Sequence, residues 1–137
     1  MARSPVTLKV DGFKDRQVDA IEYTFTQAID KEGQTTGLPR GGLIKLTVKA
    51  LNDGNCELFN WMCNSALALN GKIEFMRSDD QGIKMKDIRF LGAYCVGYTE
   101  HWENPGNSKN SLTHWENIVI TCKEIINQAV MWNNEWL

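Results

Sequence analysis

The sequence predicts a mainly β protein, a barrel or sandwich of antiparallel strands with one flanking α-helix. Apolar and polar residues alternate in several segments, most clearly in "LIKLTVKAL" (43–51). One segment, 52–69, instead places its apolar residues three and four positions apart, which is typical of a helix. Glycines interrupt the long apolar segment 83–103, as they do where strands bend at barrel corners.

The first part of the chain predicts two strands and a long loop. "VTLKVDG" (6–12) alternates and ends in a glycine turn, and "VDAIEYTFTQAID" (18–30) predicts a longer strand. The apolar face of that longer strand consists of Ile21, Tyr23, Phe25 and Ile29. "KEGQTTGLPRGG" (31–42) has four glycines and a proline, and loops of this length are often functional.

The central segments predict a half-buried strand followed by the helix. In 43–51 the residues expected to face the core are Ile44, Leu46, Val48 and Ala50. The helix is expected to begin at Asp53 or Asn55 as N-cap and to end before Asn70-Gly71. Its buried face is expected to carry Cys56, Phe59, Met62 and Cys63, while Trp61 is also interpreted as a core residue.

Strands return after the helix. "KIEFMRS" (72–78) leads through a turn at "DDQG" (79–82) into 83–103, where Gly92 and Gly97 predict bends. A last strand, 114–126, is expected to face the core with Ile118, Ile120 and Cys122. Cys95 is likewise expected to be buried, and the tail from residue 127 is polar with two tryptophans.

Composition limits the class of protein. The 137 residues predict a single domain, 1–137, and 42% hydrophobic content is that of a folded globule. The 15 basic and 17 acidic residues leave no basic excess, so no nucleic-acid partner is expected. No apolar run reaches the roughly 18 residues that cross a bilayer, so no membrane insertion is expected. The N-terminus lacks a secretory signal, which predicts reduced cysteines in a cytoplasmic protein.

The tetrapeptide His-Trp-Glu-Asn occurs twice, at 101–104 and at 114–117, and these copies contain both histidines of the chain. As the arms of a hairpin with its tip near Ser108, they would place His101 near Trp115 and Trp102 near His114. Adjacent strand positions point to opposite faces, so the two histidines would project apart. A structural hairpin is therefore favoured over a metal or acid–base site.

No catalytic, metal-binding or cofactor-binding residue is predicted, because none of the familiar catalytic, zinc-binding or phosphate-binding motifs is present. Two alternatives stay open. One is a small monomeric β-sandwich module for a glycan or protein ligand, built around Trp102, Trp115, Trp132 and Trp136. The other is a metal-dependent enzyme that uses His101, His114, Glu103 and Glu116.

Four stretches in order resemble a known family: "RGGLIKLTV" (40–48), "LFNWM" (58–62), "NGKIEFMRSDDQGIKMKDIRFLGAYCVGYTE" (70–100) and "NEW" (134–136). They are similar to the tube protein of the bacterial type VI secretion system, the haemolysin-coregulated protein (Hcp, TssD) family, in its divergent branch. Residues 1–35 match only in strand pattern, and 101–117 departs from the family.

The resemblance implies an Hcp-like barrel, similar to phage tail-tube proteins, that catalyses no reaction. It implies hexameric rings that stack into a tube, with sheath, spike and baseplate proteins as partners and effector cargo in the lumen. It also implies synthesis in the bacterial cytoplasm and export through the type VI machine, which needs no signal peptide.

The loop 31–42 corresponds by position to the extended loop that reaches the adjoining ring in this family. The exposed aromatic residues of the tail are also typical of a protein interface. The residues expected at ring–ring or subunit interfaces are Thr35, Thr36, Gly37, Leu38, Pro39, Arg40, Trp132 and Trp136.

Overall fold

A computed structural model describes residues 6–51, 53–76, 83–103 and 114–134. Within these residues the elements are β1 (Val6–Val10), β2 (Arg16–Tyr23), β3 (Leu43–Lys49), α1 (Glu57–Cys63), β4 (Leu69–Met76), β5 (Lys84–Trp102), β6 (His114–Thr121), β7 (Glu124–Asn127) and β8 (Val130–Asn133). The predicted mainly β architecture with a flanking helix is confirmed. In the described part of the chain, no helix has the length and apolar character that crossing a membrane requires.

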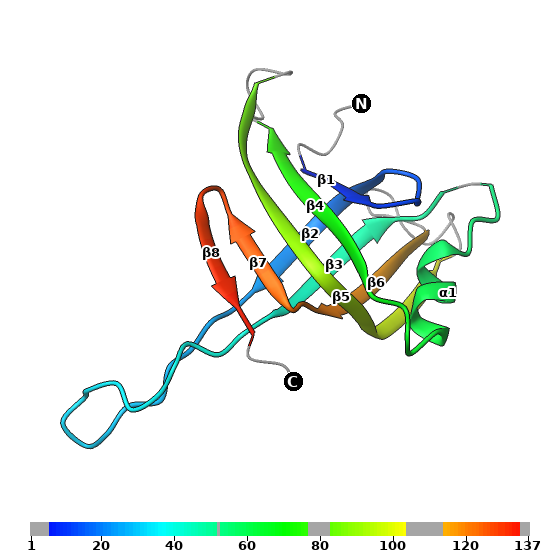
Figure 1. Ribbon diagram of the computed structural model, residues 1–137. Helices are drawn as coiled ribbons and strands as arrows, with labels where there is room; N and C mark the ends of the chain where they lie inside the picture. The colour runs from blue at the N-terminus through cyan, green and yellow to red at the C-terminus, as the bar shows by residue number, and fades with distance from the viewer. Residues whose placement is uncertain (1–5, 52, 77–82, 104–113, 135–137) are drawn as a thin grey trace.

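The strands form a barrel with a hairpin attached (Figure 1). The order is β4-β1-β2-β3-β6-β5, and pairing between β4 and β5 closes the barrel. β7 pairs with β5 and β8 pairs with β7, so this hairpin extends from the outside of the barrel. All pairings are antiparallel.

β3 shows how the predicted alternation produces the core. Its side chains at Ile44, Leu46 and Val48 are buried, with exposed fractions of 0%, 2% and 0%. β2 and β6 pair with its two edges, which satisfies the backbone polar groups of a strand at the centre of a sheet. The prediction is confirmed for these three residues, whereas Ala50 lies beyond the end of β3 and is only partly buried.

The two halves of the 19-residue strand β5 pair with different strands. Its first half pairs with β4 and β7, and its second half pairs with β6. Gly92, at the transition, has a φ of +62°, and the pairing with β6 shifts register between Cys95 and Gly97. The two predicted glycine bends are therefore confirmed, and they let one strand turn a barrel corner.

The helix lies where it was predicted, but it is shorter and packs through the other face. α1 buries Leu58 and Trp61, and Trp61 meets the Phe13 ring edge-on at 5.9 Å. Phe59 is 51% exposed, and Cys56 and Cys63 are also exposed, so the predicted buried face was wrong. The largest side chain determined the packing, because a fully buried indole removes more apolar surface from water than two thiols.

The predicted N-cap also needs correction. The helix starts after Cys56, which makes no side-chain capping bond. The Asn55 side chain, one residue earlier, accepts a 3.0 Å hydrogen bond from the Glu57 N–H. Asn70-Gly71 does not end the helix, because both residues lie inside β4. The burial of Cys95 and Cys122 is as predicted.

Two predicted strands were too long and one hairpin was missed. β2 ends at Tyr23, and the segment predicted as 114–126 divides into β6 and β7. Between them Lys123 donates backbone hydrogen bonds to the Leu91 and Gly92 carbonyls, and β7 continues along β5 from the point where the pairing with β6 ends. The tail forms β8. The predicted turn at 79–82 and the hairpin tip near Ser108 lie outside the described residues.

Candidate assembly interface

A long projection leaves the barrel between β2 and β3 (Figure 1). It consists of residues 24–42 and is called the arm. Its two sides are held together by backbone hydrogen bonds: Thr26 N–H to the Arg40 carbonyl at 2.8 Å, Arg40 N–H to the Thr26 carbonyl at 2.6 Å, and Thr36 N–H to the Ala28 carbonyl at 2.9 Å. The arm is thus a two-stranded ribbon, and residues 24–30, predicted as the second half of the strand 18–30, belong to it.

The arm tip, residues 30–34, is a compact turn. The Asp30 carboxylate accepts hydrogen bonds of 2.9 Å from the backbone N–H groups of Glu32 and Gln34. Gly33 has a φ of +87°, a conformation that glycine adopts without a steric cost. These hydrogen bonds therefore hold the tip in one conformation, although residues 30–34 are all exposed.

The base of the arm is held by an aromatic clamp, defined as Phe25 and Trp132. Their rings meet edge-on with centroids 5.0 Å apart, and the Trp132 indole N–H donates to the Pro39 carbonyl at 3.1 Å. A Cβ atom at Gly41 would lie 2.4 Å from the Phe25 ring, and one at Gly42 would lie 2.9 Å from the Trp132 ring. The two glycines allow the arm to leave the barrel at this angle.

The predicted interface residues divide into two groups. One group lies on the arm and is exposed throughout: Thr35, Thr36, Gly37, Leu38, Pro39 and Arg40. Trp132 lies at the base, where it holds the arm in place, and Trp136 lies outside the described residues. Sequence reasoning missed Ile29, which is 64% exposed on the arm although it was placed on a buried strand face. Periodicity alone does not show where a strand leaves its sheet.

The repeated tetrapeptide forms the paired ends of β5 and β6. His101 lies opposite Trp115 and Trp102 lies opposite His114, so the predicted register is confirmed. The His101 ring stacks on Trp115 with centroids 4.2 Å apart, whereas His114 meets Trp102 edge-on at 4.9 Å. Because neighbouring positions face opposite sides of the sheet, the two histidines project apart.

An open hollow of about 350 Å³ lies beside Trp102, and we call it the Trp102 hollow. The His114 Nε2 atom lies 2.6 Å from a Glu100 carboxylate oxygen at this site. The lining residues are Ala50, Leu51, Gly54, Asn55, Cys56, Glu100, Trp102, His114 and Glu116. Trp102 is 63% exposed.

Glu116, which borders the Trp102 hollow, is buried and paired. The Arg16 guanidinium donates to one of its oxygens, and the Tyr98 hydroxyl donates to the other at 2.5 Å. Burial, and then the hydrogen bond to Glu116, raises the pKa of Tyr98 well above its usual range. Both carboxylate oxygens are therefore engaged within the fold, so Glu116 holds the barrel end together.

The structure does not bring together the residues of either alternative site, the metal site or the binding site built around tryptophans. Among the described residues, no group of three or more histidine, cysteine or acidic side chains is placed to hold a metal ion. Trp102 and Trp115 face opposite sides of the sheet, and Trp132 packs on Phe25 at the base of the arm. The three described tryptophans of the alternative binding module thus lie on three different surfaces.

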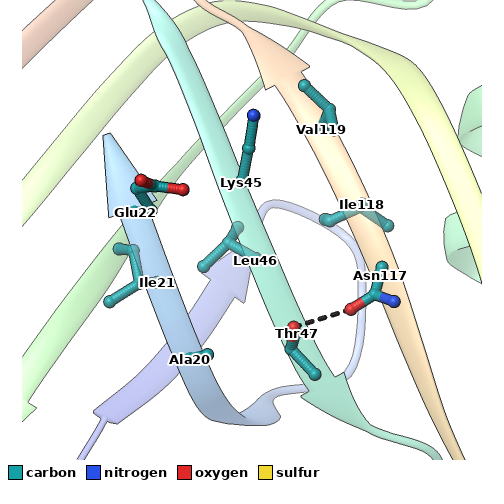
Figure 2. A pocket seen from close by; sticks show the side chains of 9 residues that line it. All are labelled: Ala20, Ile21, Glu22, Lys45, Leu46, Thr47, Asn117, Ile118 and Val119. Atoms are coloured by element: carbon teal, nitrogen blue, oxygen red, sulfur yellow. Dashed lines mark hydrogen bonds between the residues drawn. The ribbon is translucent and has the colours of Figure 1, made fainter. Parts of the chain in front are cut away.

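A second depression, of about 310 Å³, lies across β2, β3 and β6 (Figure 2). Glu22, Lys45 and Val119 occupy one row of this sheet, and the Thr47 hydroxyl donates to the Asn117 side chain at 2.6 Å. The site is an open surface of the sheet. It offers no enclosed binding cavity.

The family model for the haemolysin-coregulated protein Hcp (TssD) matches residues 3–137. The chain belongs to the Hcp family. Hcp proteins are structural tube proteins that form stacked rings in secretion and contractile injection systems, and this chain is accordingly a tube subunit. Proteins of the family are secreted by type VI systems.

Solved structures share the fold across nearly the whole chain. Hcp1 from Flavobacterium johnsoniae is 28% identical, with a TM-score of 0.82, and the match covers 94% of this chain and 98% of that one. Hcp1 from the E. coli EAEC 042 pathovar is 13% identical, with a TM-score of 0.73 and coverage of 98% and 99%.

A chain of the sheath–tube complex of an extracellular contractile injection system is 17% identical, with a TM-score of 0.57 and coverage of 91% and 88%. No curated protein matches the sequence.

Proposed function

We propose that residues 1–137 form one tube-protein domain whose copies close into a hexameric ring, and that these rings stack into the inner tube of a type VI secretion machine. The protein catalyses no reaction, and it acts by assembling and by being expelled. The residues proposed for the ring–ring or subunit contacts are Thr35, Thr36, Gly37, Leu38, Pro39, Arg40, Trp132 and Trp136.

The arm is the observation that carries this proposal. It is ordered by its own backbone hydrogen bonds, clamped at its base by Trp132, and packs against no other described part of the barrel beyond that base. Ile29 and Leu38 are 64% and 66% exposed on it. A preorganised projection with exposed apolar side chains suits a contact with another copy, because little ordering entropy remains to be lost on binding.

Ring closure needs a head-to-tail contact between two different surfaces of neighbouring copies. The β7–β8 hairpin supplies one candidate surface. Among the described strands β8 pairs only with β7, and its Val130 and Met131 side chains are 73% and 61% exposed. An unpaired strand edge that carries exposed apolar side chains is a suitable contact surface for a neighbouring copy.

The wider partners follow from the tube role. We propose that the outside of the tube contacts sheath proteins, that its ends contact spike and baseplate proteins, and that effector cargo travels in the lumen. The protein is made in the bacterial cytoplasm and leaves through the machine. Its formal net charge of −2 offers no general attraction for nucleic acid.

Negative-stain electron microscopy with light scattering tests the proposal. The wild-type chain is expected to form hexameric rings and stacks. Leu38→Asp is expected to keep the rings and lose the stacks, because it places a charge in an apolar contact. Ser65→Asp adds the same charge at an exposed position beyond α1 and is expected to stack normally. A monomeric wild-type protein would refute the tube role, and normal stacks of Leu38→Asp would refute the assignment of the arm.

A further inference from the structure

The arm and the Trp102 hollow lie at opposite ends of the same strands. β3 begins at Leu43, where the arm ends, and finishes at Lys49, directly before the lining residues Ala50 and Leu51. β6 runs the other way, so His114 lies at the hollow and Thr121 lies opposite Leu43 near the arm. In Figure 1 the arm projects from one end of the barrel and the β3–α1 connection lies at the other.

This polarity determines which surfaces meet in a stack. In a head-to-tail stack whose axis runs along these strands, the surface at one end of each barrel faces the opposite end of the next. An arm that projects beyond its own barrel then reaches the hollow end of its neighbour. Its sides run from residue 24 to 30 and from 34 to 42, so the ribbon spans about 20 Å at roughly 3.3 Å a residue.

Each surface offers an exposed apolar side chain, and Lys31 is the one basic residue of the tip, between the acidic Asp30 and Glu32. Trp102 presents an indole that is 63% exposed at the hollow, and Ile29 is 64% exposed immediately beside the arm tip. Lys31, at the tip, makes no ion pair within the described part of the chain. Glu100 is exposed at the hollow, where its carboxylate contacts the His114 ring. An apolar contact flanked by one ion pair is the usual composition of a specific protein interface.

The size of the hollow also fits the arm tip. Its volume of about 350 Å³ is at the lower end of the range for binding pockets, which suits a few side chains better than a whole element. The tip is held in one shape by the Asp30 carboxylate and needs no refolding to enter.

We propose that the Trp102 hollow is the receptor for the arm tip of the next copy along the stack. Ile29 packs on the Trp102 indole, and the Lys31 ammonium pairs with the Glu100 carboxylate. The repeated tetrapeptide then has a function, because its two copies build the wall of this receptor. The inference rests on the stacked rings of the proposed function, and it names the surface that the arm contacts.

A native cysteine makes the contact testable. Cys56 is exposed and lines the hollow, whereas Cys63 is exposed on the same helix and does not line it. The test variant is Gln34→Cys with Cys63→Ser, oxidised mildly after assembly. A disulfide requires Cα atoms within about 7 Å, so a covalent ladder on a non-reducing gel is expected only if the tip enters the hollow.

The matched control keeps Cys63 and removes the proposed partner, as Gln34→Cys with Cys56→Ser. It is expected to give no ladder although it stacks normally. Stacks of the test variant without a ladder, or equal ladders in both variants, would overturn the assignment of the hollow. A ladder from the control alone would place the tip nearer Cys63 and would also overturn it.

A charge exchange gives an independent test. Lys31→Glu and Glu100→Lys are each expected to weaken stacking, and the double variant is expected to restore it, because the pair is re-formed with its charges exchanged. Trp102→Ala is expected to abolish stacking without loss of folding, since this side chain is largely exposed. Rings that stack normally in Trp102→Ala would overturn the docking and leave the tube role standing. Wild-type rings that never stack would overturn both the docking and the stacking on which it rests.

Discussion

Replacement of Trp132 by alanine should loosen the arm while leaving the barrel folded. The indole N–H donates to the Pro39 carbonyl at 3.1 Å, and the ring meets Phe25 edge-on at a centroid distance of 5.0 Å. Both contacts join β8 to the base of the arm. Neither contact lies in the fully buried core, where Trp61 and Phe90 are the largest side chains.

The magnitude follows from these two contacts. A hydrogen bond contributes about 1 kcal/mol net, and an aromatic pair contributes about 1 kcal/mol beyond its buried area. Their loss should lower the free energy of local opening of the arm by about 2 kcal/mol. At 1.4 kcal/mol for each tenfold change, this corresponds to roughly 30-fold faster amide exchange at the base of the arm.

Native-state hydrogen exchange measures this effect directly. The reporter amides are Thr26 and Arg40, which bond to each other's carbonyl groups across the arm. Trp132→Phe keeps the ring contact and loses only the N–H donor, so it should accelerate exchange by about 5-fold, from about 1 kcal/mol. Amides of β3 serve as the internal control for global opening. Unchanged exchange of Thr26 and Arg40 in Trp132→Ala would refute the clamp.

Two further predictions concern stability. Gly42→Ala should destabilise the fold by about 1–3 kcal/mol more than Gly12→Ala in urea unfolding. Both positions have a positive φ, but only at Gly42 would the new Cβ meet a neighbouring ring; equal losses would contradict this. The raised pKa of Tyr98 favours the neutral hydroxyl, so its stabilisation is complete below the unfolded pKa near 10 and is lost as pH rises further. Tyrosinate absorbance should show one tyrosine that ionises only with unfolding, and its ionisation with the others before unfolding would contradict this.

The arrangement of arm and hollow suits a subunit that assembles repeatedly in one direction. An arm at one end of the barrel and a receptor at the other make a contact that does not close on itself, which produces a filament of rings. The clamp at Trp132 and the pair of Arg16 with buried Glu116 hold the two ends of the barrel in fixed shapes. Preorganised surfaces of this kind lose little entropy when they meet.

Local patterns predicted well those features that depend on neighbours in sequence. Strict alternation in 43–51 predicted which residues of β3 face the core, and the glycines at 92 and 97 predicted the bends of β5. The register of the repeated tetrapeptide could also be worked out, because pairing between matched arms is determined by the spacing within one hairpin. Only segment 52–69 has the three- and four-residue spacing of a helix, and α1 lies within this segment.

Features that depend on distant partners were not predictable in the same way. Trp61 is buried as predicted, but its packing against Phe13 leaves Cys56 and Cys63 exposed, which the helical spacing did not predict. The chain leaves β2 after Tyr23 although the apolar pattern continues, because Thr26 and Ile29 pair with Arg40 and Thr35 across the arm. The tail became β7 and β8 because the free side of β5 was available for pairing.

By itself, then, the sequence determined the fold class, the core of the central strands and the family to which the chain belongs, since these are encoded in local periodicity and in ordered motifs. Only the tertiary structure decided that residues 24–42 form a clamped arm, that Trp132 supports this arm, and that the Trp102 hollow lies at the opposite end. The physical reason is that an exposed ribbon and a hollow arise from pairings between residues far apart in the chain. Those pairings satisfy backbone hydrogen bonds that no local pattern specifies.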